Sequence, residues 1–595
     1  MSGPRRTFID IIEERFPALL ERVKAVSVAK KANPAKGLRS RSQDWDGLIA
    51  RWVEGLDLES NAAIALSGFG DGSHVEALMK ALPSETCVFC VEEKVEDLVA
   101  AGANERVCRL LEDRRLFIGC GELDQECFES LSRFPLLEVR SASPVIFAPI
   151  FNSSPRYYSR YFTEFARAFD YWRKLFGTNV TASGKWQSNT LKNLPILAGA
   201  PDIAVLKGAF EGRTMILISA GPSLDESLEF VRENEDRCVI VAVNSSYRAL
   251  RNAGIVPHFV LAADPYEYTA KGFDGVSCDG TILLCPYIVY SDVVRRFLGR
   301  IATWSGSNIL ANYARKKAGH SAGSHVVEMG TVSACAFDFA VLFGCTRLIF
   351  VGQDLAARTD GQLHASDSFY EEMGINSVDT GLCRQMPGNT LASVPVEEKL
   401  YVYLKVFETL AGAYSQKLEL INTSRLGARV EGIPYIPIDK MMSEKVSVEE
   451  ISIGTIRDRI VLSSLDTDWV EPFFARIEAF VQALCSLSLK GALRLEMSDE
   501  ATPSKTDLGQ VMEYRSRLLG YMEKEQELFE VIKDGALKYE LVLYTRSKGD
   551  ADGLDEIEAE CNDLKEYFWA IAEGSFALLK SIEEARCKAL VESNT

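Results

Sequence analysis

The stretch RTMILISAGPSLDESLEFV, residues 213–231, decides the fold of the central part of the chain. Its apolar run at residues 215–218 is typical of a strand buried in a parallel sheet, because both faces of such a strand are covered. A turn follows, in which Gly221 lets the backbone approach a ligand. Pro222 suits the first turn of a helix, so we expect free N–H groups here that bind a phosphate, together with Ser223.

Two further strands are predicted in CVIVAVNSSYRALRNAGIVPHFVLAADP, residues 238–265, and polar side chains stand where each strand ends. Doubly wound sheets bind their ligands at this edge. Asn244 is therefore a candidate to hydrogen-bond a base or a ribose, with capping of the next helix as the alternative. Asp264 stands alone before a proline, without the second carboxylate that would hold a divalent ion between the two, so we assign no metal.

A third stretch, at residues 328–367, predicts a helix preceded by a glycine, then a strand and a polar loop. Its sequence is EMGTVSACAFDFAVLFGCTRLIFVGQDLAARTDGQLHASD. Thr331 and Ser333 are expected at the helix N-terminus. Beyond the strand come Gln353, Asp354 and His364. Carboxylates near His364 would raise the pKa of its imidazole toward neutral pH, which suits an acid or base, although a surface histidine would do neither.

The N-terminal part has its own glycine-rich turn in NAAIALSGFGDGSHVEALMKALPSETCVFCVEE, residues 61–93. Strand, turn, helix and strand in this order, with Glu92 and Glu93 ending the second strand, resemble the start of a nucleotide-binding unit. A methyltransferase or a dehydrogenase could be built on it. Glycines also simply permit tight turns, so we favour a structural Rossmann-like domain. Cys87 and Cys90 are expected to pack in the core, because no second ligand pair completes a zinc site.

The 595 residues exceed one hydrophobic core, and three domains are predicted. The predicted class is α/β: two Rossmann-like parallel-sheet domains, N-terminal and central, are followed by a C-terminal helical domain. The expected boundaries are 1–150, 151–439 and 440–595. Helical periodicity dominates the last segment, and strand signals nearly vanish there.

Composition and charge limit the kinds of partner that the protein is expected to bind. With 47% hydrophobic and 25% charged residues the chain resembles ordinary globular proteins. The net charge of −18 argues against nucleic acid. No stretch reaches the ~18 apolar residues of a membrane span and no signal peptide precedes the first helix, so we expect a cytoplasmic protein without a membrane span. The 14 cysteines suit a reducing compartment.

Six short motifs together resemble the motility accessory factor family of flagellin glycosyltransferases. They are SAGPSLD at 219–225, VNSS at 243–246, AADP at 262–265, GTVS at 330–333, GQDLA at 352–356 with a following His-Ala, and INTSRLGARVEGI at 421–433. The likeness runs from about residue 60 to residue 435. The GPSL turn is also similar to the CMP-binding turn of bacterial sialyltransferases and to a turn of an archaeal pterin diphosphokinase.

The resemblance implies a transfer of a nonulosonic acid of sialic, pseudaminic or legionaminic type from a CMP-activated donor to Ser or Thr of flagellin, needed for flagellum assembly and motility. It implies His364 and Asp354 as catalytic residues. No cofactor is required in this interpretation, whereas a role for Mg²⁺ stays open. The residues expected to bind the nucleotide sugar are Gly221, Pro222, Ser223, Asn244, Ser245, Asp264, Thr331, Ser333, Gln353, Asn422, Thr423 and Gly427.

Three alternatives stay open. A pterin-type diphosphokinase would need carboxylates that grip Mg²⁺, for which Asp264 and Asp354 are available. A flagellin-binding accessory protein would need no catalysis. Methyl transfer by the N-terminal glycine turn would require S-adenosylmethionine.

Overall fold

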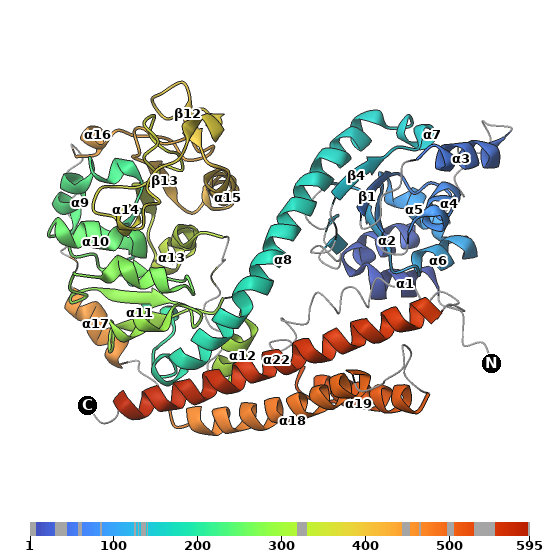
Figure 1. Ribbon diagram of the computed structural model, residues 1–595. Helices are drawn as coiled ribbons and strands as arrows, with labels where there is room; N and C mark the ends of the chain where they lie inside the picture. The colour runs from blue at the N-terminus through green and yellow to red at the C-terminus, as the bar shows by residue number, and fades with distance from the viewer. Residues whose placement is uncertain are drawn as a thin grey trace. The chain divides into compact units, whose positions relative to one another are not determined.

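The structure is a computed structural model (Figure 1), and it forms two compact units, each of which is described by itself. The first unit comprises residues 1–183, 484–520 and 532–574; the second comprises 184–483, 521–531 and 575–595. Apart from a few single positions between the ranges, the described residues are 7–29, 44–56, 62–83, 86–123, 141–306, 308–317, 330–442, 453–462, 466–496, 505–526 and 554–592.

The first unit is built on a four-stranded parallel sheet in the order β3-β2-β1-β4. Its strands are β1 (Ala62–Ser67), β2 (Cys87–Glu92), β3 (Leu116–Cys120) and β4 (Ser141–Val145). Its helices are α1 (Phe8–Arg15), α2 (Pro17–Ala29), α3 (Trp45–Glu54), α4 (Ser73–Ala81), α5 (Val95–Gly102), α6 (Glu105–Leu111) and α7 (Ala148–Phe151). Short helices after the strands explain the parallel pairing, because such crossovers return the chain to the same edge.

Both faces of this sheet are buried, and β2 shows it residue by residue. Cys87 and Phe89 belong to one core cluster, and Val88 and Cys90 belong to the other. Alternate side chains of a strand point to opposite faces, so Cys87 and Cys90 lie on opposite sides of the sheet. The expectation that both pack in the core is confirmed.

The second unit contains a seven-stranded parallel sheet in the order β13-β10-β5-β6-β7-β8-β9. Its strands are β5 (Thr214–Ile218), β6 (Val239–Val243), β7 (Phe259–Leu261), β8 (Ile282–Cys285), β9 (Ile301–Thr303), β10 (Arg347–Val351) and β13 (Glu419–Asn422). The chain adds β6 to β9 on one side of β5 and then returns to place β10 and β13 on the other side. The order of strands therefore reverses between β5 and β10, which confirms a doubly wound α/β fold.

Helices between and after these strands cover the sheet. They are α9 (Leu228–Asn234), α10 (Asn244–Asn252), α11 (Ser291–Arg295), α12 (Ile309–Lys317), α13 (Cys335–Phe343), α14 (Phe369–Glu372), α15 (Glu398–Tyr414), α16 (Ile438–Met442) and α17 (Ile453–Leu462). The loop before α15 carries a small antiparallel pair, β11 (Arg384–Met386) with β12 (Val394–Val396). The core beneath α13 and α15 is rich in aromatic rings, Phe337, Phe350 and Phe407 among them.

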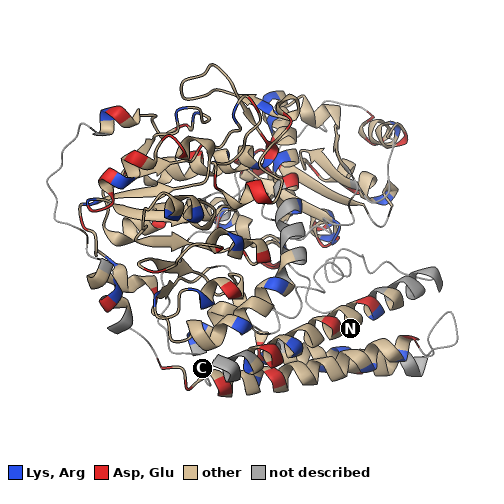
Figure 2. Cartoon of the chain, turned by 60° about the vertical axis from the view of Figure 1, so that its left-hand side comes forward, with Lys and Arg blue, Asp and Glu red and all other residues tan. Residues whose placement is uncertain are grey.

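Four long helices contain residues of both units: α8 (Pro155–Leu197), α18 (Val470–Glu496), α19 (Lys505–Lys524) and α22 (Leu554–Glu592). The helical character of the C-terminal segment is confirmed, whereas its division from the rest at residue 439 stays a prediction. Acidic and basic side chains are interspersed on the described helices (Figure 2).

Helix α18 is long and apolar enough to cross a membrane by length and composition, although we expected no such stretch. Half of its most apolar 18-residue stretch is buried inside the fold, as in the core helix of many proteins. Within the second unit, Arg586 on α22 forms ion pairs with Glu471 and Glu478 on α18, and these pairs connect the two helices.

Candidate functional site

The candidate site lies at the carboxyl edge of the seven-stranded sheet, around the reversal between β5 and β10. The loops after these two strands remain paired: the N–H group of Gly221 donates to the carbonyl of Gly352 at 2.8 Å. The hydroxyl of Ser219 donates to Oε1 of Gln353 at 2.6 Å. The GPSL turn and the GQDLA segment, which are distant in the sequence, therefore meet where doubly wound folds bind ligands.

The GPSL turn is not the open phosphate site that its sequence indicates. Pro222–Leu224 form a 3₁₀ turn, and α9 begins only at Leu228. The N–H group and the hydroxyl of Ser223 both donate to Oδ2 of Asp354, at 3.1 and 2.8 Å. The chain's own carboxylate thus occupies these donors, because a buried anion needs such hydrogen bonds.

Two glycines pack closely against Asp354. A Cβ atom at Gly221 would overlap Oδ2 of Asp354, and a Cβ atom at Gly427 would lie 2.7 Å from the backbone oxygen of Asp354. The N–H group of Ala428 donates to that same backbone oxygen at 2.8 Å. A side chain at Gly221 or Gly427 would therefore clash with Asp354, whereas the approach of a ligand to Gly221 stays a prediction.

Asp354 makes the stability of the protein depend on pH. Burial raises the pKa of its carboxyl to about 6, against the opposing hydrogen bonds from Ser223. An unfolded Asp titrates near pH ~4. The folded protein therefore holds this proton over a range in which the unfolded chain releases it. The free energy of unfolding should fall by up to about 3 kcal/mol as the pH rises from about 4 to about 6.

The variant Asp354→Asn isolates this contribution, because its amide oxygen still accepts the two bonds from Ser223. Urea unfolding of both proteins at pH 4, 5, 6 and 7 should show a smaller loss of stability with rising pH in the variant. An identical slope in the two proteins would show that Asp354 does not hold the proton.

Asn244 is the first residue of α10, and its side chain is 5% exposed. It does not cap the helix: the N-cap is Val243, and no side-chain bond is made there. The amide has no hydrogen bond to any described residue. Ser246 has a structural role, because its hydroxyl donates to the carbonyl of Ile218 at 2.7 Å, whereas Ser245 is half-buried. Asn244 is thus a buried amide with free bonding capacity at the sheet edge.

Asp264 follows the neighbouring strand β7, and its carboxylate also lacks a hydrogen bond or ion pair within the described part of the chain. Burial raises the pKa of this carboxyl, while the charge of Lys399 opposes the shift. An unpaired, desolvated carboxylate in such a position is typical of a functional site.

Three tyrosines that sequence reasoning missed surround Asp264: Tyr268, Tyr370 and Tyr403. Burial, followed by the charge of Asp264, raises the pKa of Tyr370 and Tyr403 to about 12 and that of Tyr268 still further. Lys399, in the first turn of α15, places its Nζ 5.8 Å from the ring centre of Tyr403. A signal existed in the sequence, since Tyr268 lies three residues after AADP and Tyr370 lies five residues after the His-Ala motif.

His364 lies beside this cluster, and its environment differs from our expectation. Its ring stacks on Tyr370, with the centres 3.8 Å apart and the planes inclined by 18°. Burial and then the charge of Lys399 lower the pKa of His364 to about 4, against contact with the backbone of Ala220. The expected rise toward neutral pH is therefore wrong, because burial and Lys399 lower the pKa and no carboxylate of the described residues forms an ion pair with the ring. The imidazole is neutral at pH 7.

The remaining predicted residues divide into two groups. Thr331 and Ser333 lie at a 3₁₀ turn directly before α13, and their hydroxyls are 3.0 Å apart. A Cβ atom at Gly330 would lie 4.0 Å from Tyr403, which places this turn beside the tyrosines. Asn422 and Thr423, in contrast, bond internally: Asn422 accepts the N–H group of Ser424, and the Thr423 hydroxyl donates to Phe350.

The N-terminal glycine turn is filled by side chains of its own unit. A Cβ atom at Gly70 would lie 2.9 Å from Ile150, and one at Gly68 would overlap the same side chain. Glu92 accepts the N–H groups of Phe69 and Gly70, both at 2.9 Å, so its carboxylate is already bonded. This geometry favours the structural interpretation of the turn over a cofactor site.

The two carboxylates suggested for Mg²⁺ do not fit a shared ion. Asp354 follows β10 and Asp264 follows β7, with β5 and β6 between them. Three strand spacings of ~4.8 Å put the two strand ends ~14 Å apart, too far for both carboxylates to reach one ion. Among the described residues, no three His, Cys, Asp or Glu side chains gather as a metal site.

The fold defines a doubly wound α/β domain, and the candidate site lies at its topological switch point. Residues 188–360 match the family model described as 6-hydroxymethylpterin diphosphokinase MptE-like. No curated protein matches the chain significantly.

Among solved structures, the MAf glycosyltransferase from Magnetospirillum magneticum AMB-1 has a similar fold. The TM-score is 0.58 and the identity 16%, over 95% of this chain and 88% of that chain. Together with the matched domain, this likeness supports the resemblance to the motility accessory factors.

Proposed function

We propose that the protein is a glycosyltransferase that takes a nonulosonic acid from a CMP-activated donor. The observation that carries this proposal is a group of polar side chains at the carboxyl edge: Asn244 and Asp264 follow the neighbouring strands β6 and β7, their side chains make no hydrogen bond to a described residue, and His364 lies nearby. They stand in a chain whose fold is similar to that of a glycosyltransferase. The acceptor we propose is Ser or Thr of flagellin, modified in the cytoplasm.

In this mechanism the acceptor oxygen attacks the anomeric carbon while the bond from that carbon to the phosphate oxygen of CMP breaks. The neutral imidazole of His364 accepts the proton of the attacking hydroxyl. Lys399 and the N-terminal turn of α15 supply positive potential for the leaving phosphate. This role replaces the one expected of the GPSL turn, whose donors bind Asp354.

Asn244 would hydrogen-bond the nucleotide through its side-chain amide, and Asp264 would accept hydrogen bonds from hydroxyl groups of the sugar or the ribose. The tyrosines offer flat, largely buried surfaces with hydroxyl groups, which suit a polyhydroxylated ligand. Asp354 acts in this proposal as a positioning residue that holds Ser223 and the switch-point loops.

Isothermal titration calorimetry tests the proposed function directly. Purified protein is titrated with CMP, with ATP and with S-adenosylmethionine, each with and without Mg²⁺. Binding of CMP without metal supports the glycosyltransferase. The matched MptE-like domain favours a second candidate, a pterin-type diphosphokinase, which predicts ATP binding with Mg²⁺ instead. S-adenosylmethionine alone would indicate methyl transfer, and no binding at all would indicate an accessory protein.

The variant Asn244→Ala should weaken CMP binding by up to ~10-fold, the worth of one hydrogen bond from a buried amide. Asn252→Ala is the matched control, because this second asparagine ends the same helix and is exposed. Equal affinities in the two variants would remove Asn244 from the nucleotide site. Calorimetry with the same CMP stock measures both.

A further inference from the structure

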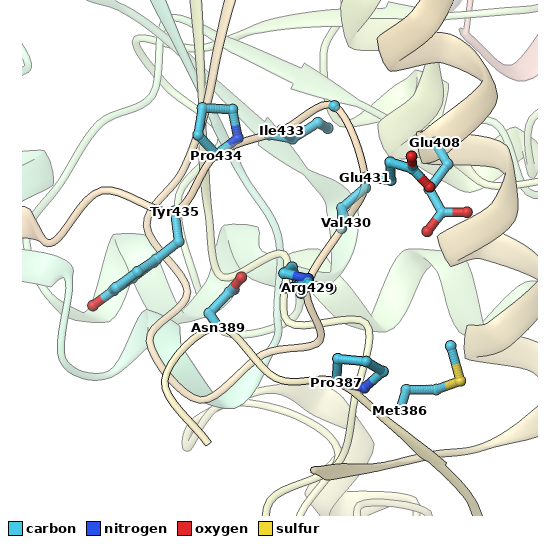
Figure 3. A pocket seen from close by; sticks show the side chains of 11 residues that line it. Met386, Pro387, Asn389, Glu408, Arg429, Val430, Glu431, Ile433, Pro434 and Tyr435 are labelled. Carbon is cyan, nitrogen blue, oxygen red and sulfur yellow. The ribbon is translucent and has the colours of Figure 1, made fainter. Parts of the chain in front are cut away.

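A cavity of about 650 Å³ lies in the second unit, and Asn244, Asp264, His364 and Lys399 do not line it. It adjoins the segment of Asn422 and Gly427, because Asn389 and Pro434 of its wall hydrogen-bond to the backbone of these two residues. Two loop segments form most of its wall, residues 386–389 and 429–435, and Glu408 of α15 completes it (Figure 3). Its volume falls within the ~300–1,000 Å³ of ordinary small-ligand sites.

Arg429 provides the positive charge of this cavity. Its backbone is held rigidly, because its N–H group donates to the carbonyl of Pro387 at 2.8 Å. Its guanidinium makes no hydrogen bond or ion pair with any described residue. Figure 3 shows it between the glutamates on one side and Asn389 on the other. An unpaired guanidinium on a rigid loop is suited to a planar carboxylate, which it binds through two parallel bonds.

The other charges of the cavity restrict the ligand. Glu431 has no partner among the described residues, and Glu408 is paired only with Lys405, at 2.6 Å. Two carboxylates beside one cation repel a polyanion such as a nucleoside diphosphate. They accept hydrogen bonds from hydroxyl or amide donors instead. The fitting ligand therefore carries a single negative charge and several donors.

The apolar side of the cavity fits the carbon face of a sugar ring. Val430, Ile433 and Pro434 line it, and Tyr435 lies on the far side of Asn389 from Arg429 (Figure 3). The hydroxyl of Tyr435 has no partner in the described part of the chain. Apolar surface with a few polar groups at its rim is the usual composition of a small-molecule site.

We propose that this cavity is a second ligand site, which binds a free sugar acid through a bidentate contact between its carboxylate and Arg429. The class of ligand, a carboxylate-bearing sugar without a nucleotide, rests on the proposed function. A backbone hydrogen bond connects this site to the transfer edge: Ala428, next to Arg429, donates its N–H group to the carbonyl of Asp354.

N-acetylneuraminic acid is the probe, titrated into the full chain and followed by saturation-transfer NMR and calorimetry. The wild-type protein should bind it, and Arg429→Ala should weaken binding ~10- to 100-fold, as expected for a charged bidentate contact. Arg429→Lys should recover only part of the affinity, because an ammonium group cannot form the two parallel bonds. The methyl ester of the sugar, which lacks the charge, should bind as weakly as the acid binds to Arg429→Ala.

Arg347→Ala is the matched control, since this arginine is paired with Glu419 at the amino ends of β10 and β13. It should bind the probe like the wild type. CMP is titrated into every variant as well, and Arg429→Ala should keep its CMP affinity. Two results would overturn the second site while the proposed function stands, provided that CMP binds. One is that the wild-type protein does not bind the sugar acid. The other is that Arg429→Ala binds the sugar acid, and the wild type binds its methyl ester, with the affinity of the wild type for the acid. Loss of CMP binding in the wild type would contradict the proposed function instead.

Discussion

Replacement of His364 by Ala is expected to lower kcat for sugar transfer ~100- to 10,000-fold, the usual contribution of a general base. The reason is the state of its ring. With a pKa of about 4, the imidazole is neutral at pH 7 and has a lone pair available for the proton of the acceptor hydroxyl. Stacking on Tyr370 orients the ring, so the lone pair is presented in one direction.

The measurement is mass spectrometry of flagellin after incubation with a CMP-activated nonulosonate and the enzyme. His364→Gln serves as a second variant, because an amide of similar size keeps a hydrogen bond but accepts no proton. CMP affinity and circular dichroism should match the wild type in both variants, which separates chemistry from folding. Wild-type turnover in either variant would exclude His364 as the base.

The pH profile gives a second readout of the same group. A protonated imidazole cannot accept a proton, so kcat should be constant near neutral pH and should fall as the pH drops through about 4. The residual rate of His364→Ala should lack that fall. Anion binding beside Lys399 would cancel part of the charge that lowers this pKa, so the fall with bound donor should occur at a somewhat higher pH.

Replacement of Gly352 by Ala is expected to lower the stability of the second unit strongly. Gly352 has a φ of +65°, which strains an alanine by about 1–2 kcal/mol. Its added Cβ atom would also overlap the carbonyl oxygen of Ser219, which is backbone and cannot rotate away. We expect the free energy of unfolding to fall by about 3 kcal/mol or more.

Gly374→Ala is the control for the backbone term. Its φ of +67° is nearly the same, and no atom lies within 4 Å of an added Cβ atom. This variant should therefore lose only the ~1–2 kcal/mol of left-handed strain. Urea unfolding, followed through the transition of the second unit, compares the two. Equal losses would show that the β5 and β10 loops separate without cost.

Sequence reasoning performed best where one local signal had one physical cause. The apolar run at 215–218 became β5, buried as predicted, because a strand covered on both faces needs apolar side chains throughout. Polar residues at strand ends were placed on the correct edge, since parallel strands all end on the same side. The pairing of GPSL with GQDLA could not be predicted, because it depends on the position at which β10 joins the sheet.

The individual roles of polar side chains were predicted less well, for a physical reason. Ser223 and Thr423 have the right chemistry for a ligand, yet their donors are satisfied inside the protein, by Asp354 and Phe350. A sequence does not show whether a buried group has already found its partner. The predicted shift in the pKa of His364 had the wrong direction for the same reason, because the sign of this shift depends on burial and on Lys399, 35 positions away.

Periodicity and turn chemistry alone therefore determined that this chain contains parallel α/β sheets, and they predicted a candidate site at the edge formed by residues 219–264 and 330–364, because these signals act over a few residues. The tertiary structure decided which polar side chains have no hydrogen-bond partner among the described residues: Asn244 and Asp264 at that edge, and Arg429 in the cavity. Whether a polar group binds a ligand or a neighbour is a matter of distances between segments far apart in the sequence, and only folding sets those distances.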